Sequence, residues 1–528
     1  MGDYCYDRAQ EKLRDALTRP NVDKETKRRF LLQAIELSLC QGETIHPELL
    51  TELKSYLGSA ITVKAEAETL HAISMAERRM GHYNDAVDFA QKSLSLYRTL
   101  SNPKAIISVL NTLAQIHASL GQWLELCKAT TEALQLARVS GDFQGYGQAL
   151  INCAVFERER GFHNLARDHY ELASQILEDE GDKYHQALVL NNLADLAITQ
   201  GDLSRGLDLW QQALFQWRTL GHRGKVATIL AQMGRIHKLR GNLQAAEGFL
   251  SAADELTSPN QTVNPLVRVY ALCETADFER TRGNLNRALR LARDAIPLLE
   301  QTEISGTDLG YVWGIVTSIY LEMKETFQAE EALAVGEAIC SSLEFSEGIV
   351  NNILLKGVLE LQKGNLGLAQ EHLENARKNA GERNYFEILI QAELSLADLY
   401  LRKLSIEFDE TTQKNAANCL MRASNLAENT ALEPRKLEAK MLEAVARSIN
   451  LQFESAAKIL NEVEARAHSL ELYLIEEKAR QIKIPVRSQM RALNIPIELD
   501  EEMQDYILKA QEYIARAKAA FRDTLERF

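Results

Sequence analysis

The sequence contains little of what interrupts helices or builds strands. In 528 residues there are nine prolines and 27 glycines, and aromatic residues make up 7% of the chain. No apolar run approaches the roughly 18 residues that a membrane span requires, so we expect no transmembrane helix. Alanine, leucine, glutamate, glutamine and arginine, which favour helices, dominate instead. The composition therefore predicts an all-α protein.

The cysteines and the charge balance restrict the compartment and the partners. Seven cysteines are scattered along the chain without a Cys-x-x-Cys pair, which is typical of reduced thiols. The first residues carry no apolar secretory signal, so the expected location is cytoplasmic. A net charge of −14 argues against nucleic acid, because its binding needs an excess of Lys and Arg. We therefore expect a protein that binds neither nucleic acid nor a membrane.

Recognisable catalytic motifs are lacking as well. The sequence has no His-Glu-x-x-His metal motif, no Walker lysine loop and no Gly-x-Ser-x-Gly nucleophile turn. His163 and His169 are six positions apart, too far round a helix to share a metal ion, and we interpret them as surface histidines. Glu157 and Glu159 are expected on a solvated helix face. The sequence thus predicts a non-catalytic protein without a metal or a cofactor.

What the sequence does contain is a recurring glycine that ends one predicted helix and precedes another. We call this position the anchor. The anchors are Gly81, Gly121, Gly161, Gly201, Gly241, Gly283, Lys324 and Gly364, and the first five are 40 residues apart. A glycine fits the left-handed end of a helix, and the Asp or Asn that often follows can cap the next helix. A weaker later copy has Leu451 at the anchor.

Small residues recur at fixed distances from each anchor. Ala154 and Ala194 lie seven residues before an anchor, Ala166 and Gly206 lie five after it, and Ala213 lies twelve after it. Helices can approach closely only where such small side chains meet. The pattern predicts about ten helical hairpins between residues 62 and 465.

This pattern resembles the tetratricopeptide repeat. The matching features are Ala194 in the first helix, the turn at residues 201–203, and Gly206 and Ala213 in the second helix. The resemblance covers about three quarters of the chain, although its spacing is longer than the family's 34 residues. It is closest to the long-period arrays of bacterial signalling regulators and of polarity adaptors that bind extended peptides. It implies a right-handed superhelical solenoid whose first helices line a concave groove.

The two ends of the chain depart from the repeat. Residues 1–61 are interpreted as an N-terminal helical cap, and residues 466–528 as a C-terminal cap or docking helix. Pro485 and Pro496 are expected to break the chain into short pieces. Residues 500–528 show a narrow apolar seam that either covers the end of the array, leaving a monomer as favoured, or joins two chains as a dimer. The insertion at residues 404–411 is predicted to be an exposed loop.

Groove positions carry the predicted binding residues. An Asn amide can bond both the N–H and the C=O of an extended peptide, so an Asn row on the first helices suggests a peptide reader. Basic residues recur three positions before the anchors, and Arg235 lies nearby. The candidate groove residues are Asn111, Asn152, Asn191, Asn192, Arg158, Arg235, Lys238 and Arg280. The alternative is that these are ordinary solvated side chains.

Two functional hypotheses follow from these features. The first is a scaffold that binds a peptide or helix of a partner protein in its concave groove. The second is a regulatory sensor, in which a peptide or small ligand changes the shape of the superhelix and signals to a separate effector chain. Solenoids suit both roles, because each repeat contacts chiefly its neighbours and the array can flex.

Overall fold

The computed structural model describes most of the chain as helix. The described residues are 23–41, 45–58, 62–258, 263, 265–300, 306–342 and 346–493, together with 513, 515, 516 and 519. The predicted seam at 500–528 thus lies almost entirely outside them, and so does Pro496. None of the described helices combines the length and the apolar character that crossing a membrane requires.

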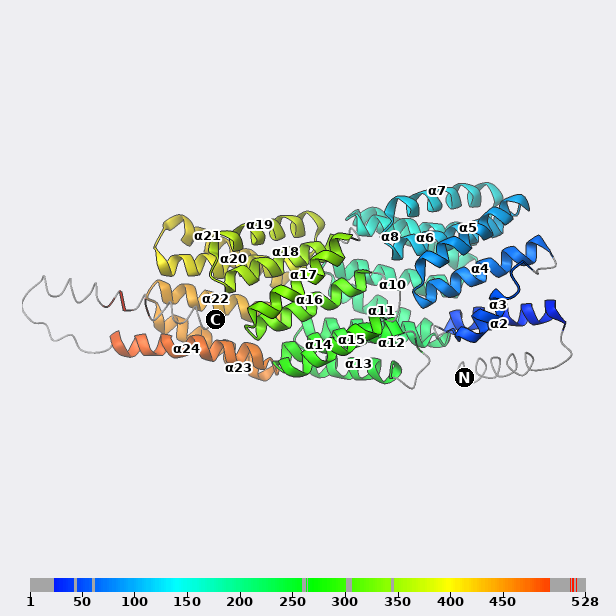
Figure 1. The fold of residues 1–528 in the computed structure, drawn as a ribbon. Helices are drawn as coiled ribbons and strands as arrows, with labels where there is room; N and C mark the ends of the chain where they lie inside the picture. Colours follow the sequence, from blue (N-terminus) through cyan, green and yellow to red (C-terminus); the bar gives the residue numbers. More distant parts are fainter. Residues whose placement is uncertain are drawn as a thin grey trace, which may run out of the picture.

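Helices α4 to α23 form ten antiparallel hairpins (Figure 1). The first helices of the hairpins are α4 (Val63–Met80), α6 (Pro103–Ser119), α8 (Phe143–Glu159), α10 (Lys183–Thr199), α12 (Arg223–Leu239), α14 (Pro265–Arg282), α16 (Gly306–Glu322), α18 (Ser346–Gln362), α20 (Phe386–Ile406) and α22 (Glu433–Ile449). The second helices are α5 (Tyr83–Thr99), α7 (Trp123–Ser140), α9 (His163–Asp179), α11 (Leu203–Thr219), α13 (Leu243–Leu256), α15 (Leu285–Glu300), α17 (Thr326–Ser342), α19 (Leu366–Arg383), α21 (Glu410–Asn429) and α23 (Phe453–Ser469). The predicted all-α solenoid of helical hairpins is confirmed.

The anchors end the first helices as the sequence pattern predicts. Gly81 and Gly201 have φ angles of 89° and 84°, in the left-handed region. Lys324 and Leu451 keep the same conformation, each with a φ of 61°, although a Cβ disfavours it. After Gly201, the side chain of Asp202 accepts a hydrogen bond from the backbone N–H of Arg205 and caps α11. The turn geometry is therefore maintained even where glycine is replaced.

The superhelix completes one turn after about five hairpins, so that later hairpins contact earlier ones. Consecutive first helices pack side by side, and the anchor turn of α14–α15 reaches α24 (Tyr473–Leu493). Arg235 on α12 forms an ion pair of 3.0 Å with Glu387 on α20, 152 residues away in sequence. The largest hydrophobic cluster likewise joins α10–α13 to α18–α24. Successive superhelical turns are thus in contact, and the molecule is an elongated, compact array (Figure 1).

The described parts of both ends pack on the array. Helices α2 (Lys24–Gln41) and α3 (Pro47–Lys54) contact α4, and α24 packs against α22 and α23. The expectation that Pro485 breaks the chain is wrong, because Pro485 lies inside the continuous helix α24. The assignment of residues 1–61 and 466–528 as caps stays a prediction.

The insertion at 404–411 lies mostly in helices and not in a loop. Helix α20 continues to Ile406 and α21 begins at Glu410, so the link is only 407–409. Leu404 and Ser405 are buried, whereas Ile406 and Phe408 are exposed. The extra residues lengthen both helices of this hairpin, because apolar side chains at the end of α20 find a packing surface there.

Candidate functional site

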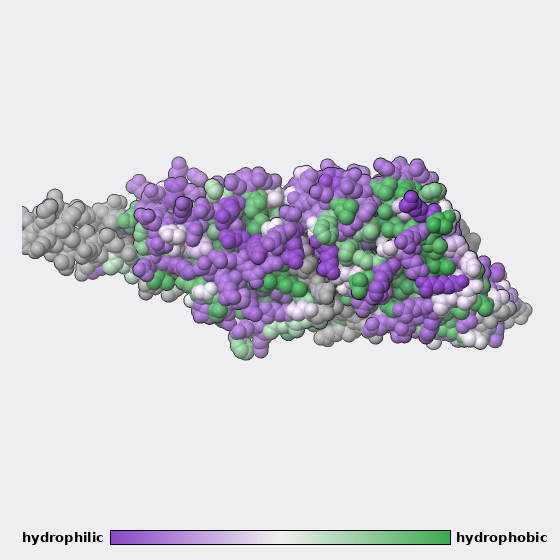
Figure 2. All heavy atoms as spheres, turned by 90° about the horizontal axis from the view of Figure 1, so that it is seen from above, coloured by the Kyte–Doolittle hydropathy of each residue, from purple (hydrophilic) through white to green (hydrophobic). Residues whose placement is uncertain are grey.

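A half-open cleft of about 470 Å³ lies among the first helices of the C-terminal half. First helices α14, α16, α18, α20 and α22, together with α24, provide its walls. Its lining combines apolar side chains such as Leu355 and Met441 with charged ones, which are Arg280, Glu322, Lys324, Asp398, Arg402, Arg435, Glu438, Glu477 and Lys478. We call this space the interior cleft. The outer surface in Figure 2 is also mainly hydrophilic over the C-terminal hairpins, with larger apolar patches over the N-terminal ones.

A chain of ion pairs connects the helices around the interior cleft. Asp277 on α14 binds both Lys238 of α12 and Arg280 of α14. Burial alone would raise the pKa of Asp277, but Arg280 and Lys238 hold it well below its usual range. Glu322 on α16 accepts from Lys478 at 2.9 Å and lies 3.7 Å from Arg280. These charges stay ionised and organise the cleft wall.

A second group of charged side chains lies toward the N-terminal half, outside the lining of the interior cleft. Arg158 lies 2.8 Å from Glu159 and 3.9 Å from Asp195, and burial raises the pKa of Asp195 despite Arg158. Burial also raises the pKa of Glu274, which accepts a 2.7 Å hydrogen bond from the hydroxyl of Tyr311. The arginine side chains here keep about a fifth to a third of their surface exposed, so a bound group can reach them.

Positive charge is concentrated where the start of α12 faces the end of α4. Burial and the nearby Arg79 lower the pKa of Lys225 to about 8, and Asp195 offsets this only in part. Burial also lowers the pKa of His222 to about 2, so this imidazole is neutral. Arg78 adds to the same positive field. This cationic region is suited to an anionic group of a ligand.

The predicted Asn residues lie on the first helices and are mostly buried. The side-chain amide of Asn111 donates to the carbonyl of Gly145 at 3.2 Å, and that of Asn152 donates to the side-chain oxygen of Asn111 at 3.2 Å. Asn191 donates to Asp195 at 3.3 Å. These amides thus connect neighbouring repeats or support a charged side chain. Asn192 is 9% exposed. Contact of these four residues with a peptide stays a prediction.

The predicted basic residues form ion pairs with acidic side chains of their own and other helices. Lys238 and Arg280 share Asp277, and Arg158 approaches Asp195 in the preceding part of the same surface. Arg235 lies between them and pairs across the superhelical turn. Of the four, Arg280 lines the interior cleft, whereas Lys238 is buried and Arg158 and Arg235 lie outside the cleft lining. Their role in binding a partner is a proposal and is taken up below.

Sequence reasoning missed the acidic side chains that organise this surface. Asp195 and Asp277 both stand six residues before an anchor. Arg235 stands at the same position in the repeat between them, so this recurring charged position was a detectable signal. Glu387 offered no such signal, because its partner Arg235 lies 152 residues away. Glu157, expected on a solvated helix face, is buried, and His163 was likewise misinterpreted as a surface residue. It is buried and lies 3.1 Å from the carbonyl of Arg383 in the next superhelical turn.

Comparison with known proteins agrees with this architecture. Residues 67–104, which span α4 and α5, match the family model described as tetratricopeptide repeat. The match covers one of the ten hairpins, so the similarity to this family is local. A search of curated protein sequences found no match.

Solved structures show only distant similarity. A chain of the hetero-tetramer of Cut9 and Hcn1 from APC/C is 15% identical, with a TM-score of 0.49, 72% of this chain and 66% of that chain covered. The chain thus spans slightly less than two thirds of that protein's length. BtubC from P. vanneervenii is 18% identical, with a TM-score of 0.33 and coverages of 43% and 91%. A Rap protein in complex with competence and sporulation factor is 14% identical, with a TM-score of 0.34 and coverages of 81% and 94%. No functional conclusion follows from similarities this low.

Proposed function

We propose that this protein is a non-catalytic interaction scaffold that binds a peptide or helix of a partner protein inside its superhelix. The observation that carries the proposal is the interior cleft, which lies between first helices and presents both charged and apolar side chains. A cleft with both kinds of side chain can hold a peptide or helix through ion pairs and apolar contacts together. A polar partner segment can replace the water that solvates these groups.

The charge distribution supports a partner segment of mixed charge. Paired residues such as Arg280 and Asp277 offer both donors and acceptors along the cleft wall. At the N-terminal side, the positive field of Arg78 and Lys225 favours an acidic group of the partner. Of the candidate groove residues, Arg280 lines the interior cleft, and contact of the others with the partner stays a prediction. The cytoplasmic location and the absence of nucleic-acid partners stay predictions.

Affinity capture with matched variants tests the proposal. The full-length protein and Lys225→Glu are used as baits in extract of the native source, with Lys128→Glu as the control. Lys128 is exposed on the second helix α7 and has only the local partner Glu125. We expect mass spectrometry to identify a partner that is retained by the control and lost by Lys225→Glu. A partner lost by the outer variant alone would contradict binding inside the superhelix.

A second function, the regulatory sensor, is supported by the contacts between superhelical turns. Arg235–Glu387 and Glu322–Lys478 are ion pairs that hold one turn against the next. A ligand that competes for either pair would loosen the array and change its length. Small-angle scattering with and without the captured partner distinguishes the two functions. A change in the radius of gyration supports the sensor, whereas unchanged dimensions support the rigid scaffold.

A further inference from the structure

The hairpin α8–α9 departs from the other four of the first five hairpins at two facing positions. Eight residues before the anchor, the first five hairpins have Ile73, Leu113, Cys153, Leu193 and Met233. Eight residues after it they have Phe89, Ala129, His169, Leu209 and Phe249. The third hairpin thus places a thiol and an imidazole where its neighbours place apolar side chains. A change at one position has many explanations, but two coordinated changes that meet in space suggest a shared role.

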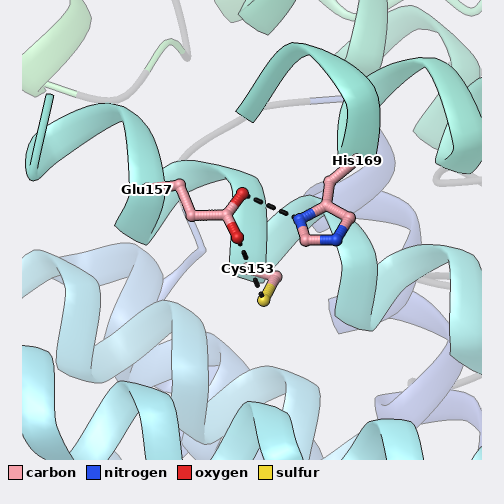
Figure 3. Close-up of side chains that lie close together, drawn as sticks. All are labelled: Cys153, Glu157 and His169. Carbon is pink, nitrogen blue, oxygen red and sulfur yellow. Dashed lines mark hydrogen bonds and ion pairs between the residues drawn. The ribbon is translucent and has the colours of Figure 1, made fainter. Parts of the chain in front are cut away.

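The two side chains converge on Glu157 (Figure 3). The Nδ1 atom of His169 lies 2.8 Å from one carboxylate oxygen of Glu157, and the thiol of Cys153 donates toward the other at 4.0 Å. One nitrogen, one sulfur and one oxygen lie within 4.8 Å of one another. Cys153 and Glu157 are one helical turn apart on α8, and His169 comes from the facing helix α9. The three ligand types therefore surround one point between two helices.

In three other hairpins a glutamate at the position of Glu157 accepts a hydrogen bond that closes the turn, and the third hairpin lacks this bond. Four residues before the anchor, Glu77, Glu279 and Glu360 accept hydrogen bonds from the side chain just after the anchor, which is His82, Asn284 or Asn365. These bonds close the turn. In the third hairpin the corresponding residue is Phe162, which offers no polar group and is exposed. Glu157 is consequently free from the turn and is directed at Cys153 and His169.

We propose that Cys153, Glu157 and His169 bind a divalent transition-metal ion of the zinc type. Zinc prefers thiolate, imidazole and carboxylate ligands in a tetrahedral arrangement, and three protein ligands leave one position for water. On binding, the thiol loses its proton to solvent and the sulfur coordinates the ion. Cys153 and His169 are partly exposed, which provides a path of entry. The bound ion would connect α8 to α9 in place of the missing turn contact.

Cobalt titration of the full chain tests this proposal. Co²⁺ bound by a thiolate in a tetrahedral site gives a near-ultraviolet charge-transfer band and visible d–d bands, and added Zn²⁺ should displace both. We expect one ion per chain, with affinity weakened about tenfold or more in Cys153→Ser and in His169→Gln. His163→Gln and Cys40→Ser are the matched controls and should bind as the unchanged protein does, because Cys40 is an exposed cysteine on α2. Circular dichroism verifies that each variant is helical.

Two results would overturn the metal site. One is the absence of a charge-transfer band at equimolar Co²⁺ in the reduced, metal-stripped protein. The other is a band that persists unchanged in Cys153→Ser, which would place the thiolate ligand elsewhere in the chain. Either result would leave the three residues as a hydrogen-bonded group. Because the site lies on α8–α9 and the test uses no partner, its outcome is independent of the proposed scaffold function.

Discussion

At the scale of single residues, close packing of the helices depends on alanine and glycine at the helix contacts. Ala213 on α11 has no exposed surface and belongs to the largest hydrophobic cluster. Ala213→Glu would place a carboxylate without a partner at this close contact and should cost several kcal/mol of unfolding free energy. Chemical denaturation measures this loss. Gln212→Glu, at the exposed neighbouring position, is the control and should change stability little.

Gly357 on α18 provides a second test of close packing. A Cβ at this position would lie 2.7 Å from Cγ of Leu373 on α19. Gly357→Ala should therefore lower the melting temperature, although alanine is the better helix former. Gly248 on α13 has nothing within 4 Å of the corresponding position. Gly248→Ala should stabilise the protein by about 1 kcal/mol. Equal effects of the two substitutions would show that α18 and α19 do not approach this closely.

At the scale of helices, the α20–α21 hairpin is longer than its neighbours and ends in a short link. Phe408 in this link is 53% exposed, while the anchor turns are closed by backbone hydrogen bonds. Among the described turns, brief chymotrypsin treatment should therefore cut first after Phe408. Mass spectrometry of the fragments identifies the site, and Phe408→Ser should remove the cut. Protection of this link in the isolated chain would indicate that another segment covers it.

The hairpins could be predicted from the sequence because their determinants are local. The anchors and the small residues act within one repeat. Gly201 therefore indicated the turn, and Ala213 indicated a buried helix contact, from the sequence alone. Even Leu451 was correctly aligned as an anchor without glycine. Pro485 was misjudged because a helix tolerates proline where packing compensates for the lost hydrogen bond.

The candidate site was less predictable, because it depends on contacts between distant repeats. The first helices could be assigned as the helices that line the groove, and Arg280 on α14 does line the interior cleft, whereas Arg158 does not. Their acidic partners depend on the curvature of the whole array, which no single repeat encodes. Curvature accumulates from small rotations between neighbouring hairpins. It is therefore visible only when several repeats are assembled.

At the scale of the whole molecule, contacts between successive turns should contribute measurably to stability. A double-mutant cycle of Arg235→Gln and Glu387→Gln tests the ion pair that connects α12 to α20. Because both side chains are about one-third exposed, we expect a coupling energy on the order of 1 kcal/mol, reduced at high salt. Arg98→Gln and Glu132→Gln, an exposed pair on the outer surface, form the comparison cycle and should couple more weakly. Zero coupling for Arg235 and Glu387 would contradict contact between the turns.

The central claim is that a partner segment binds inside the superhelix. Hydrogen–deuterium exchange of the full chain, with and without the captured partner, tests this most directly. We predict that partner binding slows exchange in the helices that line the interior cleft, which are α14, α16, α18, α20, α22 and α24. The facing second helices, α13, α15 and α21, should change least. Slower exchange confined to the second helices would place the partner on the outer surface and contradict the account.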